Sequence, residues 1–268
     1  MKRLSAALLT LLAASPLAAG LTYRFQTSTS GIQSSTLTGK VTVAAPNMRV
    51  EVLHGDGILF QDGQVVLSKD GSQTLTVIDP ASKSYYDLSL EQTFGGANSL
   101  LTQLGGSVMI TFENPKADVK NLGDGGTIEG YPTRRYAVTF SFDLVFDAMG
   151  QKMRSRVTTS SMNWMTERIG ADAMSFLQLQ GFRTGIDAVD KLMALQATKI
   201  NGFPLKQVTT VTVSQPGGRD VTSTSTTSVT GIQNASVNAQ ELAIPAGYKK
   251  VESPMDKMLR RISAAAEP

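Results

Sequence analysis

One stretch, residues 136–146, constrains the fold more than any other part of this 268-residue chain. The side chains at its even-numbered positions are all apolar: Tyr136, Val138, Phe140, Phe142, Leu144 and Phe146. Most of the positions between them are small or polar, and such a period of two predicts a β-strand with one apolar face. At about 3.3 Å per residue the strand would be roughly 36 Å long, about twice the usual length. We expect it to bend around a packed core or around a space for an apolar ligand.

Shorter segments with the same alternation precede and follow this strand. They lie at 21–26, 41–52, 58–67, 75–88, 108–112, 152–157, 205–213 and 221–232. Turn signals separate several of them, including Pro46-Asn47, Asp62-Gly63 and a glycine-rich stretch at 121–126 that we expect to form a turn. The pattern predicts an antiparallel sheet built mainly from neighbouring strands.

The hydrophobic period becomes helical in two segments. Residues 90–104 carry Leu90, Phe94, Leu101 and Leu104, with glycines between them, and residues 171–198 carry apolar side chains at helical spacing. An antiparallel sheet with one apolar face must cover that face, and these segments are the candidates to do so. We therefore expect an α+β fold, in which helices cover the concave apolar face of a strongly curved antiparallel sheet, a half-open β-barrel.

The N-terminus has the layout of a cleaved secretory signal. Met1-Lys2-Arg3 precedes an apolar run at 4–12, and the small residues Ala18 and Gly20 suit the cleavage positions −3 and −1. We expect a signal peptide at 1–20, a single domain at 21–252 and an amphipathic or flexible tail at 253–268. The apolar run is too short for a membrane anchor, which needs about 20 residues. The chain has no Cys for disulfides or lipidation, so we expect a soluble periplasmic protein.

The charge and the residue types exclude several classes of partner and chemistry. Removing Lys2 and Arg3 leaves 23 basic against 22 acidic residues, a net charge of +1, which does not favour nucleic acid as a partner. The only histidine, His54, lies in a glycine-rich turn, and no G-x-S-x-G, H-E-x-x-H or phosphate-loop motif is present. We expect no catalytic residues, no metal and no cofactor. A hydrolase acting through His54 is the enzymatic alternative.

The remaining feature is apolar surface. We expect a cavity between the sheet and its covering helices to be lined by Tyr23, Phe25, Phe140, Phe142, Leu144, Phe146, Trp164, Phe176 and Leu192. The alternative is an ordinary filled core, because core aromatics and pocket aromatics follow the same sequence pattern.

Four short motifs resemble a known group of exported proteins. They are VIDPASKSY at 77–85, IEGYPTRRY at 128–136, GFPLK at 202–206 and IPAGYKKV at 244–251. In this order they resemble the periplasmic lipoprotein-carrier superfamily (the LolA, LolB and RseB types), and in particular its uncharacterised exported members. Each motif lies at a turn or at the start of a strand, so the resemblance concerns the fold more than an activity.

The resemblance implies a curved sheet around a hydrophobic cavity closed by helices. The leading hypothesis is a periplasmic, non-enzymatic binding or carrier protein for a lipid, a lipoprotein acyl chain or another apolar molecule. The alternative is a protein-interaction or stress-sensing module of the cell envelope that holds no ligand.

Overall fold

The structure, a computed structural model, describes most of the chain. The described residues are 17–31, 34–56, 60–69, 74–89, 108–148, 151–170, 190–191, 194, 198–214, 217–254, 256–257 and 260–261.

In these residues twelve strands form one sheet, in the order β12-β6-β5-β4-β3-β2-β1-β11-β10-β9-β8-β7. The first six strands are β1 (Leu17–Ser30), β2 (Ser35–Ala44), β3 (Asn47–Gly55), β4 (Val65–Ser68), β5 (Thr74–Asp79) and β6 (Ser84–Ser89). The others are β7 (Val108–Ile128), β8 (Tyr131–Ala148), β9 (Gln151–Thr166), β10 (Phe203–Ser214), β11 (Val221–Asn238) and β12 (Lys249–Lys250). A short 3-10 helix, η2 (Ala239–Leu242), follows β11.

The predicted long strand is confirmed: residues 136–146 lie within β8, which pairs with β7 on one side and β9 on the other. The expected turn at 121–126 is wrong, because these residues belong to β7. Register shifts flank Asp124 there, and Gly123 and Gly126 have positive φ values of 80° and 77°. The glycines thus shape irregularities within a strand, since a bulge uses the same residue types as a turn.

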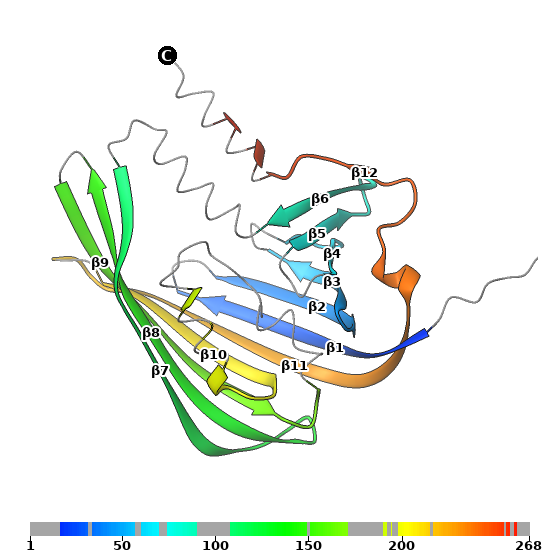
Figure 1. Cartoon of the computed structure of the whole chain (residues 1–268), viewed down its shortest axis with the longest axis horizontal. Coiled ribbons are helices and arrows are strands. Elements are labelled where there is room, and N and C mark those ends of the chain that lie inside the picture. Colours follow the sequence, from blue (N-terminus) through cyan, green and yellow to red (C-terminus); the bar gives the residue numbers. More distant parts are fainter. Residues whose placement is uncertain are drawn as a thin grey trace, which may run out of the picture.

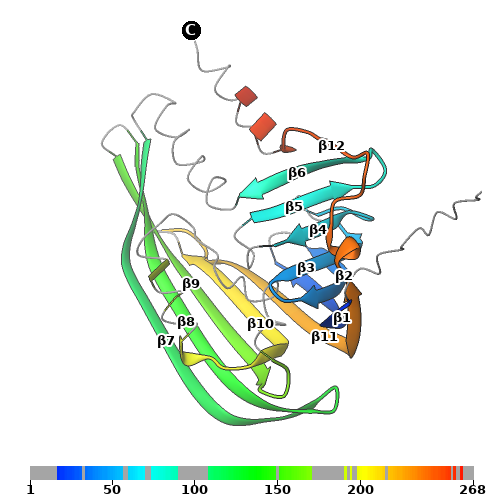
Figure 2. The ribbon, with the colours of Figure 1, turned by 45° about the vertical axis from the view of Figure 1, so that its right-hand side comes forward.

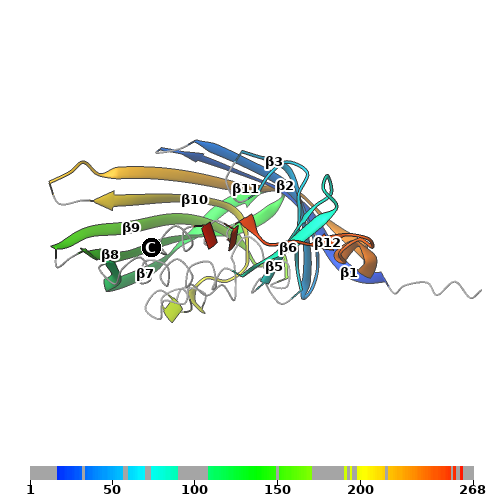
Figure 3. The same cartoon turned by 90° about the horizontal axis from the view of Figure 1, so that it is seen from above.

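The sheet is strongly bent (Figures 1 and 2). The long strands β7–β10 form one wall, β2–β6 and β12 form the other, and β1 and β11 lie between them. Seen from above, β9, β10 and β11 project well beyond β5, β6 and β12 (Figure 3). The face enclosed by this bend is called the inner face below.

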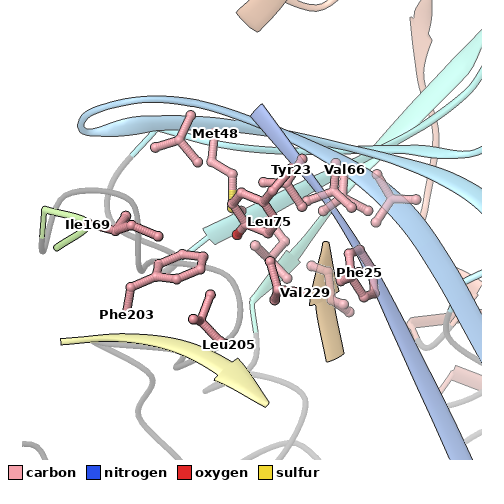
Figure 4. Packing of buried hydrophobic residues seen from close by; sticks show 14 residues of the cluster. Tyr23, Phe25, Met48, Val66, Leu75, Ile169, Phe203, Leu205 and Val229 are labelled. Atoms are coloured by element: carbon pink, nitrogen blue, oxygen red, sulfur yellow. The ribbon is translucent and has the colours of Figure 1, made fainter. Parts of the chain in front are cut away.

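The main hydrophobic core joins the two walls. Tyr23 and Phe25 of β1 pack in one cluster with Phe203 and Leu205 at the start of β10 and with side chains of β2–β6 (Figure 4). Phe203 is fully buried, and its ring meets that of Tyr23 edge-on, with centroids 5.2 Å apart. The bend thus lets one part of the sheet cover the apolar face of another.

The expected α+β class is wrong. The described part of the chain is nearly all β and holds no helix that covers a face of the sheet, and the sheet is mixed because β12 runs parallel to β6. Where the core is described, strands from the opposite wall bury the apolar face that we expected helices to cover. Residues 90–104 and most of 171–198, the expected covers, lie outside the described residues.

The N-terminal strand overlaps the expected signal peptide. β1 begins at Leu17, and Leu17–Gly20 pair with residues 235–238 of β11. A Cβ atom at Gly20 would lie 2.3 Å from the carbonyl oxygen of Val43, so the sheet packs closely at this point. The division into 1–20, 21–252 and 253–268 stays a prediction. Within the described residues, no helix has the length and apolar character needed to cross a membrane.

Candidate functional site

Strand register places the long β8 strand on the same face as the core. Directly paired residues of an antiparallel ladder point to the same side of a sheet. Thr27 pairs with Thr227, and from there the pairing continues through Gln207 and Asn163 to Tyr136. Since Phe25 and Thr27 are two residues apart on β1, the even-numbered residues of β8 share the inner face with Phe25.

Beyond Val138 the inner face carries a set of apolar side chains that we call the apolar row. It consists of Phe140, Phe142, Leu144 and Phe146 of β8 and Phe112 of β7, all half-buried. The ring centroids of Phe112 and Phe142 are 5.4 Å apart, as are those of Phe140 and Phe142, both in tilted geometry. Favourable ring contacts therefore hold the middle of the row together.

On four strands a polar band lies between the core and the level of the apolar row. It consists of Thr27, Thr29, Ser161, Asn163, Gln207, Thr209, Ser225 and Thr227, on β1, β11, β10 and β9. Its side chains bond to one another across the strands, as between Thr27 and Thr227 at 2.9 Å and from Gln207 Nε2 to Asn163 Oδ1 at 2.7 Å. Asn163 Nδ2 is buried and has no hydrogen-bond partner. On these four strands the filled core thus gives way to hydrogen-bonded polar side chains, whereas on β8 the row directly follows the buried Tyr136 and Val138.

The structure divides the residues predicted to line a cavity. Tyr23 and Phe25, 1% and 3% exposed, belong to the filled core. Phe140, Phe142, Leu144 and Phe146 lie together in the apolar row. Trp164 pairs with Arg135 and Lys206 on the opposite, outer face, where Lys206 Nζ lies 5.1 Å from the ring centroid. Phe176 and Leu192 lie outside the described residues.

Among the inner-face residues missed as candidates are Phe112 and Met153. Phe112 follows Val108 and Ile110 in an alternating stretch. This alternation indicated that Phe112 lies on an apolar strand face, but it could not show that the neighbouring strand would be β8. Met153, 65% exposed, pairs with Phe146 at the far end of the row. Met153 carried no useful signal, because only the pairing of β8 with β9 shows that it lies beside an aromatic ring.

Charged groups gather on the outer face of the long strands. The buried carboxylate of Asp143 accepts hydrogen bonds from Asn114 Nδ2 at 2.8 Å, Arg156 Nε at 2.9 Å and Arg154 Nη1 at 2.9 Å. These donors, the Asn114 amide first and then the guanidinium groups, lower the pKa of Asp143. Arg154 also pairs with Glu113 of β7, so the network connects β7, β8 and β9.

Tyr23, in the core, is a titratable group whose pKa burial itself shifts. Its hydroxyl has no hydrogen-bond partner, and burial in the core raises the pKa of Tyr23 above its ordinary value. The phenol therefore stays neutral at physiological pH and acts as a core side chain.

His54 lies near the end of β3, paired with Thr38 of β2, and not in the expected turn, and a carboxylate lies beside it. Its Nδ1 lies 3.3 Å from Asp62 Oδ1, and the same oxygen accepts a hydrogen bond from the backbone N–H of Gly55 at 2.7 Å. The Gly55 bond and the nearby His54 lower the pKa of Asp62. Both side chains are more than half exposed. Within the described ranges, no group of three or more His, Cys, Asp or Glu side chains could hold a metal ion.

Comparisons with known proteins concern most of the chain. A family model described as "Domain of unknown function (DUF4412)" matches residues 29–248. No curated protein matches the sequence.

Two solved structures are similar over most of their length. One is an uncharacterised conserved protein from Thermus thermophilus, with 11% identity, coverage of 85% of this chain and 89% of that one, and a TM-score of 0.34. The other is a LolA superfamily protein from Nitrosomonas europaea, with 11% identity, coverage of 84% and 90%, and a TM-score of 0.30. The similar structures thus include the superfamily that the four motifs resemble.

Proposed function

The chain belongs to the DUF4412 family of domains of unknown function, and we propose that it is a non-enzymatic binding protein of the periplasm. The proposed ligand is the acyl chain of a lipid or lipoprotein, or a similar apolar molecule. This ligand lies against the inner face of the bent sheet.

The observation that carries this proposal is the apolar row. Four apolar side chains of one strand follow one another at every second position on the inner face, and Phe112 of the next strand joins them. All five keep part of their surface exposed, whereas the core aromatics on the same face are at most 4% exposed. Each methylene group that a ligand buries there contributes about 0.8 kcal/mol, so a long acyl chain gains substantial binding energy.

The polar band supports treating the row as a separate surface. On β1, β11, β10 and β9 its hydrogen-bonded side chains lie between the packed cluster around Phe203 and the level of the row, and that cluster does not include the row or the buried Tyr136 and Val138 that precede it on β8. A ligand on the row would leave the core packing and its contribution to stability unchanged.

One form of the alternative function, a module that recruits a protein through the sheet edge, is disfavoured at β7, one of the two edge strands of the sheet. β7 shows three register shifts against β8, and it carries Pro115, Lys116 and Lys120. Bulges, proline and lysine are the devices by which natural sheets prevent pairing with another strand. β7 is therefore a poor site for adding a partner's strand.

Titration with a fluorescent fatty acid tests the proposal. We expect saturable uptake by the wild type, and at least tenfold weaker uptake by Phe142→Ala, which removes the ring at the centre of the row. Leu53→Ala is the matched control, because Leu53 is apolar and 54% exposed but lies on β3, away from the row. Its uptake should equal that of the wild type.

Native mass spectrometry of protein purified from its host adds an independent measurement. A bound apolar molecule that dissociates from the Phe142→Ala variant would support the proposal. Uniformly ligand-free protein that also takes up no fatty acid would overturn it, and a stoichiometric protein partner in a pull-down from periplasmic extract would then favour the interaction module.

A further inference from the structure

A second candidate site lies away from the apolar row, at the end of the β7–β8 hairpin. A pocket of about 400 Å³ opens there, lined by Gly123, Asp124, Pro132, Thr133, Arg134, Met165, Glu167 and Arg168. Thr133 and Met165, 4% and 2% exposed, are its buried members, and the four charged side chains belong to exposed residues. A volume of this size is in the range of small-molecule sites.

Irregularities in β7 create the pocket wall. Register shifts occur on both sides of Asp124, and bulges of this kind redirect side chains. The wall is braced internally, since the backbone N–H of Gly126 donates to Asp124 Oδ1 at 2.9 Å and Thr133 Oγ1 donates to the carbonyl of Gly126 at 2.8 Å. The shape of the pocket therefore does not require the charged side chains to bond to one another.

The charged side chains of the pocket are not paired with each other. Arg134 and Asp124 are direct cross-strand partners, and Glu167 and Arg168 are neighbours in the chain. Nevertheless, among the ion pairs within 4.0 Å in the described part of the chain, none includes any of these four residues. Two guanidinium groups and two carboxylates thus border one space with their binding capacity largely unused.

This combination selects a ligand that carries both charges. Guanidinium groups recognise phosphate oxygens with several parallel N–H bonds, and carboxylates accept hydrogen bonds from an ammonium group. A simple anion would pair with the arginines but lie beside two carboxylates. A simple cation would pair with the carboxylates but lie beside two guanidinium groups. We propose that the pocket binds a phosphate joined to an ammonium by a short linker, with the phosphate on Arg134 and Arg168 and the ammonium on Asp124 and Glu167.

This chemistry has two sources, a soluble phosphoethanolamine ester and the head group of a phosphatidylethanolamine lipid. Calorimetric titration with glycerophosphoethanolamine tests the shared chemistry. We expect saturable binding that weakens about tenfold or more in Arg134→Gln, Arg168→Gln and Glu167→Gln, because each change removes a charge-assisted hydrogen bond. Arg219→Gln and Asp220→Asn, exposed residues outside the pocket, are the controls and should bind as the wild type does.

Single-charge probes test the zwitterionic requirement. Inorganic phosphate alone and ethanolamine alone should each bind at least tenfold more weakly than glycerophosphoethanolamine. Phosphate binding as tight as that of the ester would overturn the proposal and leave a plain anion site. Absence of saturable binding by every probe, vesicles included, would also overturn it.

Vesicles distinguish the two sources. Co-sedimentation with phosphatidylcholine vesicles only when they contain phosphatidylethanolamine, and its loss in Arg168→Gln, would support the lipid head group as the source. Binding of the soluble ester without such co-sedimentation would support a soluble ligand. The pocket does not include the apolar row, so failure of fatty acid uptake and failure of this proposal are separate results.

Discussion

Phe203 and Phe142 lie on the same inner face of one sheet but in different surroundings. Phe203 is fully buried between the two walls, where Tyr23 and side chains from both walls enclose it. Phe142 touches Phe112 and Phe140 within the long-strand wall and remains half-buried. An apolar period of two therefore indicates which face a side chain occupies, whereas the opposing surface decides if that side chain is core or available for a ligand.

The largest expected effect is that of Phe203→Ala. The truncation removes a fully buried ring and should lower the free energy of unfolding by about 3–5 kcal/mol, measured by urea denaturation. A loss below about 1 kcal/mol would show that the two walls are not packed through this residue, and the contrast with Phe142 would collapse.

Gly39→Ala tests how closely the core half is packed. A Cβ at Gly39 would lie 2.6 Å from Cε1 of Phe25 and 2.9 Å from the carbonyl oxygen of Glu51. We expect a loss of about 1–3 kcal/mol in the free energy of unfolding, because a filled core must shift to admit the methyl group. Gly170→Ala is the control, since a Cβ there meets nothing within 4 Å. Equal stability of the two variants would argue against close packing around Phe25.

Phe142→Ala should affect stability less than the two core changes and ligand uptake more. Its ring contributes two contacts to the apolar row, so we expect a loss of about 1 kcal/mol by urea denaturation. A loss as large as that of Phe203→Ala would mean that the row is part of the core, which would remove the basis for ligand binding there.

Asp143→Asn tests a charged residue on the outer face, in contrast to the apolar residues of the inner face. Its effect on the free energy of unfolding should depend on pH. The folded state lowers the pKa of Asp143, so the carboxylate stabilises the fold above its unfolded pKa of about 3.9 and loses this contribution as the pH falls through the folded value. The variant should be less stable than the wild type at pH 7, and the difference should shrink below about pH 4. Urea denaturation at both pH values measures this, and a difference independent of pH would contradict the role of the ionised carboxylate.

Local periodicity was enough to predict β8 and the inner-face residues Phe140, Phe142, Leu144 and Phe146, because alternation over eleven residues is an internal property of one strand. The same alternation placed Tyr23 and Phe25 on an apolar face but did not distinguish core from ligand surface. The position of Trp164 could not be predicted from alternation alone. The register between β8 and β9 pairs it with Arg135 and so puts it on the outer face.

Two errors show why local signals were insufficient. The glycine-rich stretch 121–126 resembles a hairpin turn, but β8 pairs with Asn121 and Asp124 within it, and the stretch is an irregular part of β7. The α+β prediction assumed that a sheet needs helices to cover it, whereas the bend of this sheet brings Phe203 and Leu205 onto Tyr23 and Phe25. The second outcome depends on residues far apart in the chain, and the first on pairing with the following strand, so the local pattern of either segment alone does not contain it.

The sequence by itself determined that the chain forms long amphipathic strands, because side-chain alternation follows directly from the geometry of an extended backbone. It also determined membership of the DUF4412 family. Only the tertiary structure decided which apolar residues fill the core, which form the half-buried row and which charges meet in the pocket beside Asp124. These assignments depend on strand register and on the bend of the sheet, and both arise from contacts between distant residues.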